Sequence, residues 1–156
     1  MGEVYGLTNS EIAFLEALAA HHVPFMIVGL SAAAMQGAPV VTQDIDLWFN
    51  RLDDPALRDA LREAGVAYVA PQIDQPPMFA GPNLEKLDIV VNMTGLGSFD
   101  EEIKNTILLP IGGQNIPVLK LERILASKKA AGRAKDLMSI PILSDVLRVR
   151  QNMPEK

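Results

Sequence analysis

The first clear pattern along the chain is an apolar stripe with helical spacing over residues 9–20. Thr8, followed three residues later by Glu11, matches the capping box that closes the first turn of a helix. A fully apolar run over residues 25–28 comes next and is bracketed by a proline and a glycine. These patterns predict a helix over 9–20 and a buried strand over 25–28.

Similar patterns continue to the C-terminus. The Ala-rich segment 31–36 predicts a short helix, and the Asp-Asp-Pro start at residue 53 predicts a helix that ends at Gly65. The segment 71–83 is rich in proline and polar residues, so its structure is left open. The remaining predictions are strands over 44–49, 66–70 and 84–92, a capped helix over 98–105, a hairpin of 107–111 with 115–118, and helices over 120–131 and 134–150, the last kinked or split at Pro141.

This order of elements predicts an α/β (α+β) fold, in which a mixed β-sheet is flanked by helices. Residues 119–150 would form a helical C-terminal tail. A length of 156 residues suits one domain that spans 1–156 and has a core large enough to fold unaided.

Composition narrows the class of protein. With 49% hydrophobic and 21% charged residues, the chain is typical of a folded domain rather than a disordered one. A formal net charge of -5 excludes a generally basic surface for nucleic acid, although a local basic patch stays open. Residues 1–6 lack the pattern of a signal peptide, and the most apolar stretch, 23–35, is too short to span a bilayer. We therefore expect a cytoplasmic protein with no membrane partner.

The predicted turn from strand to helix at Gly29-Leu30-Ser31 is the first candidate for chemistry. A glycine before a helix lets backbone amides approach a ligand closely, and the hydroxyl of Ser31 adds a polar contact. Together they predict a phosphate cradle. The alternative is a tight turn that needs Gly29 only for its conformation.

The pair Asp44 and Asp46 is the second candidate. Side chains alternate along a strand, so both carboxylates would project from one face while Ile45 faces the other way. Two carboxylates this close repel, and a divalent cation such as Mg²⁺ or Mn²⁺ would relieve the repulsion. The alternative is a solvated strand, or a strand end that pairs with Lys or Arg.

Asp88 is the third candidate, an acid in an otherwise apolar strand. If its strand lies beside that of Asp44 and Asp46, it adds a third carboxylate to the same face, and three carboxylates can bridge two metal ions. The alternative is an ion pair with Lys86 or another surface cation.

Four cations also lie close together in an otherwise acidic chain, and they would neutralise phosphates or form a solvated helix end. These are Lys128, Lys129, Arg133 and Lys135. Trp48 lies among apolar strand residues, which favours a place in the core, with stacking on a base as the alternative.

The order of these motifs is more specific than any one of them. Strand, Gly-x-Ser, helix, Thr-x-Asp-Ile-Asp-Leu, and then a strand with one more Asp resembles the nucleotidyltransferase superfamily that includes DNA polymerase beta. The chain looks most like the small bacterial members, including the AbiEii toxin group of abortive-infection systems. The resemblance runs from Phe25 to Asp88 and continues weakly over 119–136, where Lys-Lys-x-x-x-Arg-x-Lys-Asp-Leu resembles a basic helix pair of these proteins.

The resemblance implies an enzyme that moves a nucleoside monophosphate from a nucleoside triphosphate to an acceptor hydroxyl, with two Mg²⁺ or Mn²⁺ ions. Asp44, Asp46 and Asp88 would be the catalytic and metal-binding carboxylates. The nucleotide-binding positions would be Gly29, Ser31, Thr42, Lys128, Lys129, Arg133 and Lys135. The acceptor stays open among a tRNA end, a protein and a small molecule, and a homodimer or a partner chain would help to recognise it.

Two positions depart from the pattern of the superfamily. Leu30 replaces the second glycine of the usual Gly-Gly-Ser loop, and Val40 stands where small members often carry an arginine. These departures leave a second hypothesis open. In it the chain is a degenerate member that binds a nucleotide without turnover, or an interaction module of a toxin–antitoxin pair.

Overall fold

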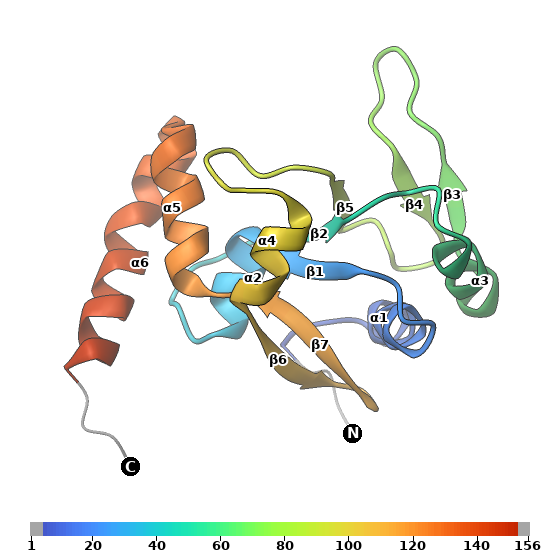
Figure 1. The fold of residues 1–156 in the computed structure, drawn as a ribbon, viewed down its shortest axis with the longest axis horizontal. Helices are drawn as coiled ribbons and strands as arrows, with labels where there is room; N and C mark the ends of the chain where they lie inside the picture. The colour runs from blue at the N-terminus through green and yellow to red at the C-terminus, as the bar shows by residue number, and fades with distance from the viewer. Residues whose placement is uncertain (1–4, 153–156) are drawn as a thin grey trace.

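The computed structural model describes residues 5–152 of the chain. Residues 1–4 and 153–156 lie outside the described residues, so the prediction about a signal peptide falls largely outside them too. The architecture is α+β, with a mixed sheet flanked by helices (Figure 1), and this confirms the predicted fold class.

The main sheet has five strands in the order β5-β2-β1-β7-β6. Strands β1 and β2 are antiparallel, as are β6 and β7, whereas β5 runs parallel to β2 and β7 runs parallel to β1. The strands are β1 (Phe25–Val28), β2 (Ile45–Phe49), β5 (Leu87–Val90), β6 (Thr106–Ile111) and β7 (Gln114–Leu119). A separate two-stranded sheet pairs β3 (Ala67–Val69) with β4 (Met78–Ala80), which lies in the segment that the sequence left open.

The helices flank this sheet. Helix α1 packs against α3 and β7, α2 packs against β1, β2 and α5, and α5 packs against α6. The α5–α6 pair and the β3–β4 hairpin lie at opposite ends of the longest axis (Figure 1). The helices are α1 (Asn9–Ala20), α2 (Gly29–Met35), α3 (Pro55–Ala64), α4 (Phe99–Glu102) with a 3-10 turn (Ile103–Asn105), α5 (Leu121–Ala131) and α6 (Ala134–Gln151). Within residues 5–152, none of them is both long and apolar enough to cross a membrane.

Helix α1 begins where the capping box predicts. The Thr8 hydroxyl accepts a hydrogen bond from the Glu11 amide at 3.1 Å, and Glu11 Oε1 accepts one from the Thr8 amide at 2.8 Å. Two amide groups that the first turn leaves free are thereby satisfied. The predicted bounds of α1 and β1 are confirmed to the residue.

Aromatic side chains fill the core on both faces of the main sheet. Phe49 contacts Phe79, which contacts Phe14 of α1, with ring centroids 5.6 Å and 4.9 Å apart. Trp48, the next residue along β2, instead contacts Phe99 of α4 with centroids 5.7 Å apart. Since Trp48 is only 1% exposed, its predicted place in the core is confirmed and stacking on a base is wrong.

Most boundaries differ from the prediction by one or two residues, and two elements differ in a more informative way. Strand β5 is shorter than 84–92, since the turn closed by the Leu87 amide and the Leu84 carbonyl precedes it. Helix α6 runs through Pro141 without a break, so the predicted split is wrong. Proline removes one hydrogen bond to the carbonyl four residues earlier, but Pro141 and Leu137 are both exposed and water can hydrate that carbonyl.

Candidate active site

Strand pairing brings Asp46 and Asp88 together. The two residues lie at paired positions of the parallel strands β2 and β5, so their side chains project from the same face about 5 Å apart. Asp46 is half-buried and Asp88 is exposed. The prediction that Asp88 lies on the same face as Asp46 is thereby supported, and within the described residues Asp88 makes no ion pair with Lys86.

Asp44 lies just before β2 rather than inside it, because the strand begins at Ile45. The Thr42 hydroxyl accepts a hydrogen bond from the Asp44 amide at 3.3 Å and donates one to the Asp44 carbonyl at 3.0 Å. This small turn orients the exposed Asp44. Thr42 therefore has a local structural role, and its role as a nucleotide contact stays a prediction.

The carboxylates influence one another electrostatically. The pKa of Asp46 is raised to about 6, mainly by burial and in addition by the negative charges of Asp88 and Asp44, while Lys128 and Lys135 oppose the shift. Burial and the charge of Asp44 also raise the pKa of Asp88. The three carboxylates therefore repel one another, and a bound cation would reduce the free-energy cost of this repulsion.

The described residues at this edge of the sheet do not form a complete metal site by themselves. Within residues 5–152, no three His, Cys, Asp or Glu side chains are gathered closely enough to hold a metal ion by themselves. Mg²⁺ is commonly held by one or two carboxylates together with water and substrate phosphates. Asp46 and Asp88 fit that arrangement, whereas Asp44 lines a different pocket from Asp46.

The turn after β1 brings the backbone close to Asp46. Gly29 has φ +70°, and a Cβ atom built on it would lie 2.4 Å from Asp46 Oδ2. Any side chain at position 29 would therefore strike this carboxylate. The glycine is therefore needed for the carboxylate of Asp46 to approach the backbone, and its role in a phosphate cradle stays a prediction.

Ser31 has a different place from the one predicted. It is buried, its hydroxyl donates to the Val28 carbonyl at 2.9 Å, and it accepts a bond from the Asp46 amide at 3.4 Å. The hydroxyl proton is thus engaged within the turn. Ser31 lines the pocket on the other side of α2 together with Thr42 and Asp44, whereas Gly29 and Asp46 line a separate cleft.

That cleft has a volume of about 470 Å³ and lies between the sheet and the corner where α5 meets α6. Three of the four predicted cations line it across from Asp46: Lys128, Arg133 and Lys135. Lys129 does not line it, because consecutive residues on a helix point about 100° apart. The cleft therefore joins a carboxylate edge to a cationic corner.

Asp136 organises the cationic corner and was missed in the sequence. Its side chain is fully buried and accepts hydrogen bonds from Lys128 Nζ at 3.1 Å and from Arg133 Nε at 2.7 Å. Burial alone would raise the pKa of Asp136, but the bonds from Arg133 and Lys128 outweigh it and hold the pKa at about 2. Its spacing of three from Arg133 was the only available signal, since the contact with Lys128 depends on how α6 folds back on α5.

A group of uncharged polar residues also lines the cleft and has no sequence motif. Asn92 and Thr94 lie in the loop after β5, and Ser127 lies on α5. The Ser127 hydroxyl donates to the Thr94 carbonyl at 2.8 Å and so fixes the loop to the helix. These residues are far apart in sequence, and only the fold brings them together.

Neither a family model nor a curated protein matches the sequence. Among solved structures, ANT(2'')-Ia in complex with adenylyl-2''-tobramycin matches with a TM-score of 0.56 and 16% identity, over 89% of this chain and 88% of that one. An antigenic nucleotidyltransferase-like protein from Paracoccidioides brasiliensis matches with a TM-score of 0.52 and 15% identity, over 90% of this chain and 78% of that one. The chain therefore has the nucleotidyltransferase fold, and its relation to the AbiEii group stays a prediction.

Proposed function

We propose that this protein is a metal-dependent nucleotidyltransferase. The observation that carries the proposal is the cleft in which Gly29 and Asp46, with Asp88 in register beside it, face Lys128, Arg133 and Lys135. Adjacent carboxylates suit a divalent cation, and cations across from them suit a polyphosphate. The likeness of the fold to ANT(2'')-Ia and to a nucleotidyltransferase-like protein supports the proposal.

The chemistry is an in-line displacement at the α-phosphorus. The acceptor hydroxyl loses its proton, its oxygen forms a bond to the α-phosphorus, and the bond to the bridging oxygen breaks to release pyrophosphate. Asp88, exposed and beside Asp46, would favour loss of the proton. Mg²⁺ or Mn²⁺, held by Asp46 and Asp88 with Asp44, would supply charge neutralisation and a more acidic acceptor hydroxyl.

The cationic corner would bind the leaving phosphates. Lys128 and Arg133 keep fixed directions because Asp136 holds them, so little rearrangement would accompany binding. Lys135 adds charge from the first turn of α6. Catalysis would come mainly from positioning and charge neutralisation.

The structural neighbour ANT(2'')-Ia guides the choice of substrates to test first. The complex of ANT(2'')-Ia contains an adenylyl group joined to tobramycin, which supports ATP as the first donor to test and a small molecule as the first acceptor class. A tRNA end and a protein hydroxyl stay in the acceptor panel. A second chain that helps to recognise the acceptor remains a prediction.

A second candidate function is nucleotide binding without turnover, within a toxin–antitoxin pair or alone. The engaged hydroxyl of Ser31 favours it, as does Val40, which packs against the core where an arginine would reach a phosphate. The two candidates differ in whether product forms.

The test is transfer of α-labelled nucleotide to the acceptor panel in the presence of Mg²⁺ or Mn²⁺. We expect labelled product from the wild-type chain and a loss of about 100-fold or more in Asp46→Asn and Asp88→Asn. Asp59→Asn, an exposed change on α3, is the matched control and should keep full activity. Nucleotide binding without any product favours the second candidate, and neither binding nor product contradicts both.

A further inference from the structure

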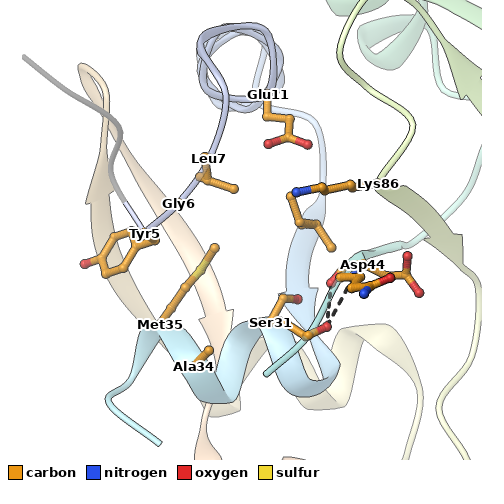
Figure 2. A pocket seen from close by; sticks show the side chains of 12 residues that line it. Tyr5, Gly6, Leu7, Glu11, Ser31, Ala34, Met35, Asp44 and Lys86 are labelled. Carbon is orange, nitrogen blue, oxygen red and sulfur yellow. Dashed lines mark hydrogen bonds between the residues drawn. The ribbon is translucent and has the colours of Figure 1, made fainter. Parts of the chain in front are cut away.

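A second pocket lies on the other side of α2 from the cleft, with a volume of about 320 Å³. Its walls come from the segment that leads into α1, from α2, and from the starts of β2 and β5 (Figure 2). The volume is at the small end of the range for ligand pockets, roughly 300–1,000 Å³. Its lining is Tyr5, Gly6, Leu7, Glu11, Ser31, Ala34, Met35, Thr42, Gln43, Asp44, Ile45 and Lys86.

Glu11 is the unusual residue of this pocket because it is a carboxylate that is only 1% exposed. The capping box uses Oε1, which accepts the Thr8 amide at 2.8 Å. The other oxygen, Oε2, is buried and has no hydrogen-bond partner among the described residues. A buried carboxylate oxygen without a donor is costly, so the position indicates a partner that binds from the pocket.

The second capping box of the chain shows that capping does not explain this burial. At the start of α4, Glu101 plays the same part toward Ser98, and its Oε1 accepts from both the amide and the hydroxyl of that serine at 3.0 Å. Glu101 is nevertheless exposed to solvent. The cap at Glu11 would work equally well at the surface, so its inward position calls for another reason.

Lys86 provides the opposite charge. Figure 2 shows its ammonium group and the Glu11 carboxylate pointing toward one another in the pocket. Among the described residues neither side chain takes part in an ion pair. Leu7, Ala34 and Met35 add an apolar wall beside the two charges. The pocket therefore presents the buried carboxylate of Glu11, the exposed carboxylate of Asp44, the positive charge of Lys86 and an apolar surface.

We infer that this pocket binds a small zwitterion of the α-amino acid class with an apolar side chain. The ammonium group of the ligand donates to Glu11 Oε2, its carboxylate accepts from Lys86 Nζ, and its side chain packs on Leu7 and Met35. Lys86 is exposed, so its flexible side chain can turn from Glu11 toward the ligand carboxylate and uncover Oε2. An acid alone would face the carboxylates of Glu11 and Asp44, and an amine alone would leave the ammonium of Lys86 unpaired, so a ligand with both charges suits the pocket.

This site is separate from the proposed transfer reaction and does not depend on it. The two pockets share the wall built from the start of α2 and the Asp44–Asp46 segment, but Glu11 and Lys86 line only the second pocket. Binding to the second pocket can therefore be measured without nucleotide, metal or acceptor.

The experiment is titration of the full chain with the proteinogenic amino acids by calorimetry and by ligand-observed NMR at millimolar concentration. For an apolar binder such as L-leucine, the matched probes are isopentylamine, which lacks the carboxylate, and 4-methylpentanoate, which lacks the amine. We expect an apolar amino acid to bind and both truncated probes to bind about tenfold more weakly or worse. Failure of every amino acid, or equal binding of either truncated probe, overturns the inference.

Variants locate the site. Glu11→Gln keeps the cap, because glutamine also serves at this position of a capping box, and removes only the charge. We expect Glu11→Gln and Lys86→Met each to weaken binding about tenfold, whereas Glu101→Gln, the same change in the other capping box, leaves it unchanged. Circular dichroism checks that each variant is folded. If Glu11→Gln and Glu101→Gln bind the amino acid equally well, the site is elsewhere and the inference is wrong.

Discussion

The cationic corner and the carboxylate edge face one another across the cleft, yet they handle charge differently. At the corner, the buried Asp136 pairs with both Lys128 and Arg133. At the edge, within the described residues, Asp46 and its neighbouring acids make no ion pair, and burial together with the charges of Asp88 and Asp44 raises the pKa of Asp46 to about 6. The charges of the corner are therefore paired by the protein itself, whereas those of the edge are not, which is why we propose a cation there.

The largest expected effect is the loss of stability when the buried charge of Asp136 is removed from the cationic corner. Asp136→Asn places an amide NH₂ group against Lys128 or Arg133 and leaves buried donors opposed, so we expect a loss of about 3 kcal/mol in the free energy of unfolding. Urea denaturation at neutral pH measures it. Asp145→Asn is the matched control, since Asp145 pairs with Arg148 at the same spacing of three but on the surface. That change should cost below about 1 kcal/mol. Equal losses in the two variants would mean that Asp136 does not organise the corner.

The next effect has the opposite sign and tests the edge. Asp46→Asn removes a half-buried charge that its neighbours repel, so we expect the metal-free protein to gain on the order of 2 kcal/mol in stability at neutral pH. Urea denaturation in a chelator measures the gain. Added Mg²⁺ should stabilise the wild-type chain and not the variant. A metal-free variant less stable than the wild type is the outcome that contradicts an uncompensated edge.

The smallest expected effect is the different response of the carboxylate edge and the cationic corner to a fall in pH. The folded pKa of Asp46 is about 6 against an ordinary 3.8, so its cost is present above pH 6 and disappears as pH falls toward 3.8. The folded pKa of Asp136 is about 2, so its stabilising contribution is present above 3.8 and is lost as pH falls through 2. Solvent reaches Arg133, which is 58% exposed, and limits this second effect to about 1 kcal/mol.

The measurement is the difference in unfolding free energy between wild type and each variant, taken from neutral pH down to pH 2. The difference for Asp46→Asn should shrink first, over the range from 6 to 3.8. The difference for Asp136→Asn should shrink only below 3.8. If both differences shrink over the same pH range, the carboxylate edge and the cationic corner do not differ in their response to pH.

Local signals explain which parts of the fold the sequence predicts well. Helix α1 and strand β1 have sharp ends because a capping box, a proline and a glycine fix the backbone there. Strand β4 had no such signal, since it pairs only with β3 and lies within a segment of prolines and polar residues. Its strand conformation comes from Phe79, which is buried between Phe14 and Phe49.

The candidate site divides in the same manner. The sequence identifies Asp46 and Asp88 as candidate metal ligands, and the pairing of β2 with β5 then places the two residues in register. The roles of Ser31 and Asp136 depend instead on which groups the fold brings within hydrogen-bond distance. Spacing along one strand or helix is thus readable from sequence, whereas partners on separate elements are not.

The close approach of Gly29 to Asp46 has a consequence for how this chain can change over generations. An L-residue at position 29 would meet the Asp46 carboxylate before any ligand did, and its backbone would be strained as well. A single substitution at position 29 therefore has to displace the carboxylate of Asp46 and strain the backbone at once. Loss of that carboxylate in a descendant of this chain would remove only the clash, so the positive φ would still favour glycine at position 29.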